Sequence, residues 1–140
     1  MQPAPELRAF VEEAFRFLAT KNADGFLTQE SRDPNAVFIG TDPKEWFIGL
    51  AGWEPVVRAM AAGSSGDGTI PADLQVHAMQ EGTVAWIAAR WTGHLPNGAT
   101  LPFRATSVVH QENGVWKEVQ FHASVAVPDE QVGSIAQPAG

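Results

Sequence analysis

The chain has 140 residues, of which 44% are apolar, and 16 acidic against 9 basic residues give it a formal net charge of −7. This length and apolar content predict one domain with a hydrophobic core. Bases form no stripe along the sequence, so neither nucleic acid nor an anionic membrane surface is an expected partner. The chain has no cysteine, which excludes disulfides, thiolate catalysis and cysteine zinc sites.

The first half of the sequence predicts helices. Apolar residues recur at i, i+3 and i+4 spacing from about residue 5 to residue 21, which indicates a helix with one apolar stripe. The stripe consists of Leu7, Phe10, Val11, Ala14 and Leu18. A short helix is expected after Asp24, which we interpret as its N-cap. A short strand is expected over residues 36–39.

Two further helical segments are predicted before the sequence pattern changes. Residues 41–46 are typical of a capped helical turn, with Asp42 as N-cap and Pro43 in the first helical position. Residues 53–62 predict a helix that ends at Gly63. The glycine- and serine-rich residues 63–68 then predict a flexible connector.

From about residue 72 to residue 125 the apolar pattern has a period of two, which predicts four antiparallel strands. We place them at residues 73–80, 83–94, 100–111 and 116–125. A two-residue turn at Glu81-Gly82 and three-residue turns ending at Gly98 and Gly114 divide apolar and polar residues between the two faces. This register places Arg90 opposite Arg104, His122 opposite Arg104, and Glu118 on the polar face.

The sequence resembles the SnoaL-like branch of the nuclear transport factor 2-like superfamily. The matching segments are residues 40–46 with Gly49, residues 103–106 and residues 113–124. The resemblance implies an α+β, cystatin-like cone in which a curved antiparallel sheet wraps around the long N-terminal helix and short helices. It also implies a pocket at the open end and a homodimer formed through the sheet. We expect residues 1–127 to form the domain and residues 128–140 a loose C-terminal tail.

The apolar face of the predicted sheet is where we expect a pocket for a small, mainly apolar molecule. Two tryptophans from the helical half serve either as pocket walls or as core residues. The expected pocket residues are Trp46, Trp53, Ile87, Trp91, Phe103, Ser107 and Phe121. Ser107 is the only hydroxyl on this face, and it either orients a ligand or bonds to the backbone.

The opposite face is too aromatic for open solvent and too polar for a core, which is typical of a subunit contact. The expected interface residues are Trp86, Arg90, Arg104, Trp116, Gln120 and His122. His77 lies opposite Trp86 and His110 opposite Trp116 in this register, which indicates stacked interface pairs rather than metal ligands, so no metal site is expected.

Catalysis stays open at the level of sequence. Members of the superfamily include isomerases, cyclases, dehydratases and binding domains, and fold alone does not choose among them. The isomerase machinery includes a tyrosine, which this chain lacks. A binding domain is the first hypothesis. The second is a small acid/base enzyme of the isomerase, cyclase or hydrolase type that uses Asp42 or a histidine such as His122. The alternative for these two residues is a structural role, with Asp42 as an N-cap and His122 as an interface residue. The third hypothesis is a pure dimerisation module with a filled cone.

No phosphate-binding loop, dinucleotide fingerprint or nucleophile elbow is present, so no cofactor is expected. The N-terminal residues have neither a basic region nor an apolar stretch, so we expect no signal peptide. No apolar run approaches the roughly 20 residues of a membrane span. We therefore expect a cytoplasmic protein.

Overall fold

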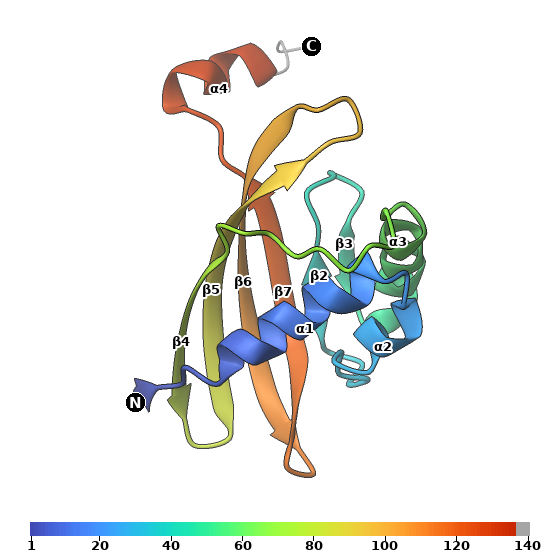
Figure 1. Cartoon of the computed structure of the whole chain (residues 1–140). Coiled ribbons are helices and arrows are strands. Elements are labelled where there is room, and N and C mark those ends of the chain that lie inside the picture. Colours follow the sequence, from blue (N-terminus) through green and yellow to red (C-terminus); the bar gives the residue numbers. More distant parts are fainter. Residues whose placement is uncertain (137–140) are drawn as a thin grey trace.

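A curved seven-stranded sheet with the long N-terminal helix across its concave side makes up the computed structural model, which describes residues 1–136 (Figure 1). The strands are β1 (Gln2–Pro3), β2 (Val37–Ile39), β3 (Trp46–Ile48), β4 (Gln75–Glu81), β5 (Val84–His94), β6 (Thr100–Glu112) and β7 (Val115–Val125). Their order in the sheet is β1-β4-β5-β6-β7-β2-β3. The predicted α+β class and cone-like architecture are confirmed.

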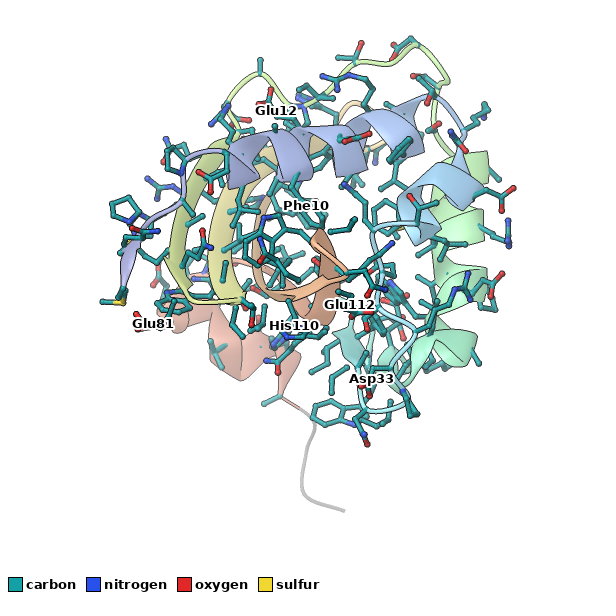
Figure 2. The ribbon with its side chains drawn as sticks, turned by 90° about the horizontal axis from the view of Figure 1, so that it is seen from below. Phe10, Glu12, Asp33, Glu81, His110 and Glu112 are labelled. Carbon is teal, nitrogen blue, oxygen red and sulfur yellow. The ribbon has the colours of Figure 1, made fainter. Side chains whose placement is uncertain are left out.

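Helix α1 (Leu7–Ala19) crosses the concave face of the sheet (Figure 1). Its apolar stripe reaches two core clusters: Phe10 and Val11 contact one that contains Leu7, and Leu18 contacts the other. Viewed along the sheet in Figure 2, Phe10 lies between α1 and the strands, whereas Glu12 lies on the outer side of the helix. The helix ends where Lys21 adopts a positive φ of 58°.

Helices α2 (Ala23–Leu27) and α3 (Leu50–Ala62) lie beside one end of α1 (Figure 1). Asn22, not Asp24 as predicted, caps α2, since its side chain accepts a hydrogen bond from the Gly25 N–H at 2.9 Å. Helix α3 begins earlier than predicted, directly after Gly49, whose φ of 84° favours glycine.

Strands β2 and β3 extend the sheet beyond β7. β2 runs parallel to β7, with Phe38 beside Phe121, and β3 pairs antiparallel with β2. The predicted helical turn at residues 41–46 is the loop between these strands, and Trp46 begins β3. In that loop Asp42 Oδ1 accepts a hydrogen bond from the Lys44 N–H at 2.8 Å, which closes a turn rather than a helix.

The meander β4–β7 has the predicted order, with corrections at two of its three turns. Leu95 and Ala99 are joined across a three-residue turn, and Arg90 lies opposite Arg104, both as predicted. The β4–β5 register is shifted by two residues, so that Arg90 faces Gln75 instead of Asp73. A shift of two residues leaves every side chain on its predicted face.

The β6–β7 hairpin departs from the prediction in a way that changes the site. Glu112 pairs with Val115, so Asn113 and Gly114 form a two-residue turn, with φ of 53° and 78°. Positive φ at both positions is the property of a type I′ turn, for which Asn-Gly is a preferred sequence. The three-residue turn predicted here is therefore wrong.

A β-bulge next to this turn restores the predicted faces farther along β7. Val109 pairs with Glu118 and Val108 pairs with Gln120, which leaves Val119 as the extra residue. Between the turn and the bulge, side chains of β7 point opposite to the prediction. Beyond the bulge, Phe121 lies on the concave face and His122 on the convex face, as predicted.

The C-terminal stretch predicted as a loose tail contains helix α4 (Asp129–Ile135), which has no buried residue. Residues 137–140 of that predicted tail lie outside the described residues. The division of the chain at residue 128 stays a prediction. Within residues 1–136, no helix is both long and apolar enough to span a membrane.

Candidate functional site

A cavity of about 330 Å³ lies between the helices and the concave face of the sheet. Members of both core clusters line it, including Trp53 and Ile87, and most of the lining is apolar. At the mouth lie Thr41, from the β2–β3 loop, and Met60, from α3, both exposed to solvent. The polar side chains of the lining belong to Gln29, Glu30, Thr41, Glu45, Ser107 and Glu118. Two of these are buried carboxyl groups, and they decide what the cavity can do.

Glu118 reaches the cavity because of the hairpin turn and the bulge in β7. The two-residue turn directs Glu118 to the concave face, where it pairs with the fully buried Val109. The bulge immediately after it returns Phe121 to the same face. Glu118 is consequently 8% exposed, and its Oε2 accepts a hydrogen bond of 2.6 Å from the Ser107 hydroxyl on β6.

Glu30 is placed beside Glu118 by backbone hydrogen bonds. The segment after α2 runs parallel to β7: the Glu118 N–H donates to the Gln29 carbonyl at 2.8 Å, and the Ser31 N–H donates to the Glu118 carbonyl at 2.9 Å. The Gln29 side chain also donates to the Phe10 carbonyl of α1 at 3.1 Å. Glu30 is held between helix and sheet and is 3% exposed.

The two carboxyl groups shift each other's protonation. Burial raises the pKa of Glu118 to about 7, while hydrogen bonds from Ser107 and with Glu30 act in the opposite direction. Burial also raises the pKa of Glu30 well above its ordinary value, and the negative charge of Glu118 and the hydrogen bond with it raise that pKa further. Glu118 therefore exchanges a proton near pH 7, and the raised pKa of Glu30 favours its protonated form.

Trp53 adds an unused donor to this end of the cavity. Its indole Nε1 is buried without a hydrogen-bond partner, and so is Oε2 of Glu30. The indole lies near enough to lower the pKa of Glu30 slightly, yet the two groups do not form a hydrogen bond of normal geometry. A buried donor without a partner is costly, so a ligand oxygen or a water molecule has a suitable place here.

Six of the seven residues predicted for the pocket line the cavity: Trp53, Ile87, Trp91, Phe103, Ser107 and Phe121. Trp53 and Phe121 are in contact, with ring centroids 5.6 Å apart, and Trp91 stacks on Phe103 at the same separation. The Ser107 hydroxyl donates its hydrogen bond to the Glu118 carboxylate and not to the backbone.

The prediction for Trp46 is wrong. This tryptophan is 67% exposed and does not line the cavity, because in β3 its side chain points to the convex face of the sheet. Asp42 is exposed in the β2–β3 loop and is likewise not part of the lining. The neighbouring Glu45 and Thr41 reach the mouth of the cavity instead.

The predicted interface residues lie on the convex face, with one exception. Trp86, Arg90, Arg104, Gln120 and His122 occupy outward positions on β5, β6 and β7. Trp116 does not: it lies between the turn and the bulge, faces inward and contacts the core cluster that contains Leu7. His122 pairs with Thr106 and not with Arg104, because the true register differs by two residues.

Both carboxyl groups were missed at the level of sequence. A three-residue turn at Asn113-Gly114 predicts Glu118 on the polar face, whereas the two-residue turn directs it to the concave face. The type I′ preference of Asn-Gly was the signal that pointed the other way. Glu30 follows a short helix in a polar stretch, and nothing in its local sequence indicates burial.

No group of three or more metal-binding side chains is close enough together within residues 1–136 to hold an ion. In this part of the chain, Glu30 and Glu118 therefore form no metal-binding group with a histidine or with Glu45 at the mouth of the cavity. Two carboxyl groups in an apolar site can accept and donate protons.

A curved sheet around a long helix, enclosing a cavity that opens at one end, defines the class of nuclear transport factor 2-like folds. The family model of the SnoaL-like domain matches residues 7–128, and the chain belongs to this family. No curated protein has a matching sequence.

Solved structures share this fold at low sequence identity. An NTF2-like protein of unknown function from Pseudomonas putida KT2440 is 16% identical, with a TM-score of 0.70 over 90% of this chain and 88% of that one. A proposed dehydratase of the NTF2-like family from Streptomyces avermitilis is 14% identical, with a TM-score of 0.63 over 87% and 95%. The association domain of CaMKII from C. elegans is 16% identical, with a TM-score of 0.59 over 85% and 92%.

Proposed function

We propose that this SnoaL-like protein binds a small, mainly apolar molecule in its cavity and that the Glu30–Glu118 pair moves a proton to or from it. The observation that carries the proposal is the presence of two adjacent buried carboxyl groups at the wall of an otherwise apolar cavity. Burying such a pair is costly to the fold unless both groups share protons. Groups of this kind cluster at functional sites.

The protonation states suit both halves of an acid/base reaction. A general acid or base works best when its pKa lies near the operating pH, and that of Glu118 is about 7. The ionised Glu118 is the proton acceptor, and the neutral Glu30 is the donor to an oxygen of the ligand. The same pair then returns the proton, so that no external oxidant or cofactor is required. The earlier candidates Asp42 and His122 play no part in this proposal.

The ligand has an apolar body with one oxygen. A cavity of about 330 Å³ is at the small end of ligand sites. A carbonyl or hydroxyl oxygen next to Trp53 Nε1 would give this buried donor its missing partner. Isomerisation and dehydration of a small hydroxy or keto compound are the reaction classes that such an arrangement serves.

The test uses a neutral ketone whose proton transfer is visible without knowledge of the natural substrate. Cyclohexanone is incubated with the protein in D₂O near neutral pD, and loss of the protons next to the carbonyl is followed by NMR. We expect exchange faster than in buffer, reduced by roughly 100-fold in Glu118→Gln and unchanged in Glu13→Gln, an exposed glutamate of α1.

Chemical shifts of backbone amides in the same samples separate binding from catalysis. Shifts at cavity residues without catalysed exchange would leave a binding protein and remove the acid/base role. Exchange that persists in Glu118→Gln would also remove that role. Neither shifts nor exchange with cyclohexanone, or with a larger ketone such as camphor, would contradict the proposal as a whole.

The proposal extends to assembly and location. The fold likeness to an association domain of CaMKII supports self-association, and we propose a homodimer through the convex face, where aromatic and polar side chains are mixed. A cytoplasmic location belongs to the same proposal and is supported by the lack of cysteine, which fits a reducing compartment. Cell fractionation with an antibody against the protein tests the location.

A further inference from the structure

The convex face of β4–β7 has a charge pattern opposite to that of the whole chain. All four histidines occupy outward positions on these strands, namely His77, His94, His110 and His122. Arg90, Arg104 and Lys117 lie on the same face. The outward carboxylates within the four strands, Glu81 and Glu112, stand at the turn ends of the hairpins. The middle of this face is therefore basic in a protein of net charge −7.

Two arginines at the centre of the face are adjacent without a compensating acid. Arg90 and Arg104 are direct partners on neighbouring antiparallel strands, an arrangement in which like charges repel. Within residues 1–136, neither guanidinium forms an ion pair with a carboxylate. Arg90 Nε donates to Gln75 Oε1 at 2.8 Å, which orients one guanidinium. The acid just before β4, Asp73, is engaged by the hydroxyl and the N–H of Thr92.

A shallow groove of about 600 Å³ follows these two arginines. Its polar side chains are Gln75, His77, Arg90, Arg104, Thr106, His122 and Ser124, and alanines form much of the remainder. Every charged or polar group in this lining can donate a hydrogen bond, and none is a carboxylate. The charged and polar side chains of the groove therefore favour an anion as its ligand.

We propose that this groove binds an oxyanion, the sulfate-, phosphate- or carboxylate-like group of a small molecule, between Arg90 and Arg104. A guanidinium presents two parallel donors that match two oxygens of such a group. The hydroxyls of Thr106 and Ser124 and the imidazoles of His77 and His122 supply further donors around it. The bound anion removes the repulsion between the two arginines.

A second copy of the chain does not fill this role by itself. Two convex faces placed against each other would bring four arginines together and no carboxylate from the middle of either face. A homodimer through this face would therefore itself need an anion between the arginines, and the inference does not depend on the proposed cavity function.

Titration with sulfate tests the site directly, because this ion keeps its charge across the neutral range. Backbone and arginine side-chain NMR signals are followed at constant low ionic strength, with sodium chloride as the matched salt. We expect saturable shifts at residues of the groove. Binding should weaken about tenfold or more in Arg104→Gln, since hydrogen bonds to charged groups contribute about 1.5–3 kcal/mol, and stay unchanged in Arg16→Gln on α1.

A parallel titration with sodium acetate tells a planar carboxylate from a tetrahedral anion. Arg104→Lys, which keeps the charge but loses the two-donor fork, should bind more weakly than wild type and more tightly than Arg104→Gln. If Arg104→Gln binds each anion as tightly as wild type does, the result would mean an adventitious ion only and would overturn the site. Shifts that never saturate for either anion would overturn it as well.

Discussion

Two adjacent carboxyl groups in an apolar cavity have a direct effect on protein stability. A carboxyl whose pKa is raised on folding holds its proton in the folded state at pH values where the unfolded state has lost it. For Glu118 this window extends from its ordinary pKa of 4.5 to about 7. The stabilising contribution is present below pH 4.5 and is lost as the pH rises through 7, and the raised pKa of Glu30 acts in the same direction.

The first prediction follows from this linkage. Glu118→Gln carries no charge, so relative to wild type it should gain unfolding free energy between pH 5 and pH 8. The expected gain is on the order of 3 kcal/mol, because the pKa of Glu118 is about 7 in the folded protein against an ordinary value of 4.5. Urea unfolding at the two pH values measures it, with Glu13→Gln as the control. The same difference from wild type at both pH values would contradict the raised pKa.

The second prediction concerns the hydroxyl that holds Glu118. The Ser107 hydrogen bond at 2.6 Å favours the ionised carboxylate and lowers its pKa. Ser107→Ala should therefore raise the pKa of Glu118 above 7, observed as a shift of the titration of its carboxyl carbon in NMR. Ser124→Ala, on the convex side of β7, should leave that titration in place. An unchanged titration in Ser107→Ala would show that the hydroxyl has no such role.

At the level of elements, strand β7 combines the turn, the bulge and two faces of different character. The third prediction compares adjacent residues beyond the bulge. Phe121→Ala should cost less than the roughly 3–5 kcal/mol of a fully buried phenylalanine, because the ring borders an existing cavity. We expect about 2 kcal/mol by chemical unfolding. His122→Ala, exposed on the other face, should cost under about 0.5 kcal/mol. The reverse order would contradict the register of β7.

Local pattern predicted the elements whose contacts are local. The stripe of α1 and the alternation in β4–β7 are readable because one face of each is apolar, and Pro96 with Gly98 marks a turn that the structure confirms. The pairing of β2 with β7 joins segments about 80 residues apart and has no local signal. The bulge at Val119 is also invisible, because its effect on the faces cancels that of the shorter turn beside it.

The candidate site was readable only in part for the same reason. The apolar lining residues lie on regular strands and could be placed by alternation. Glu118 depends on turn length, and Glu30 depends on a backbone contact between the segment after α2 and β7. The Glu30–Glu118 pair arises from tertiary structure. The sequence therefore predicts the apolar lining of the cavity but not its two carboxyl groups.

For the whole molecule, the convex face carries both proposed contacts. The fourth prediction is that the protein sediments as a homodimer at micromolar concentration. Trp86 and the exposed Trp46 and Ile48 lie on this face, 38%, 67% and 61% exposed, and burying them requires an interface of at least about 1,000 Å². Trp86→Glu should shift sedimentation toward the monomer, while Met60→Glu at the cavity mouth should not. A wild-type protein that sediments as a monomer would contradict the proposed homodimer.

The central claim, that Glu30 and Glu118 form a proton-sharing pair in the cavity, is tested most directly by NMR titration. The glutamate carboxyl carbons are labelled with ¹³C, and the two signals are assigned from Glu30→Gln and Glu118→Gln. We predict that Glu118 titrates near pH 7, that Glu30 titrates well above its ordinary value, and that replacing either residue shifts the titration of the other. Two independent titrations near the ordinary value of 4.5 would contradict the account.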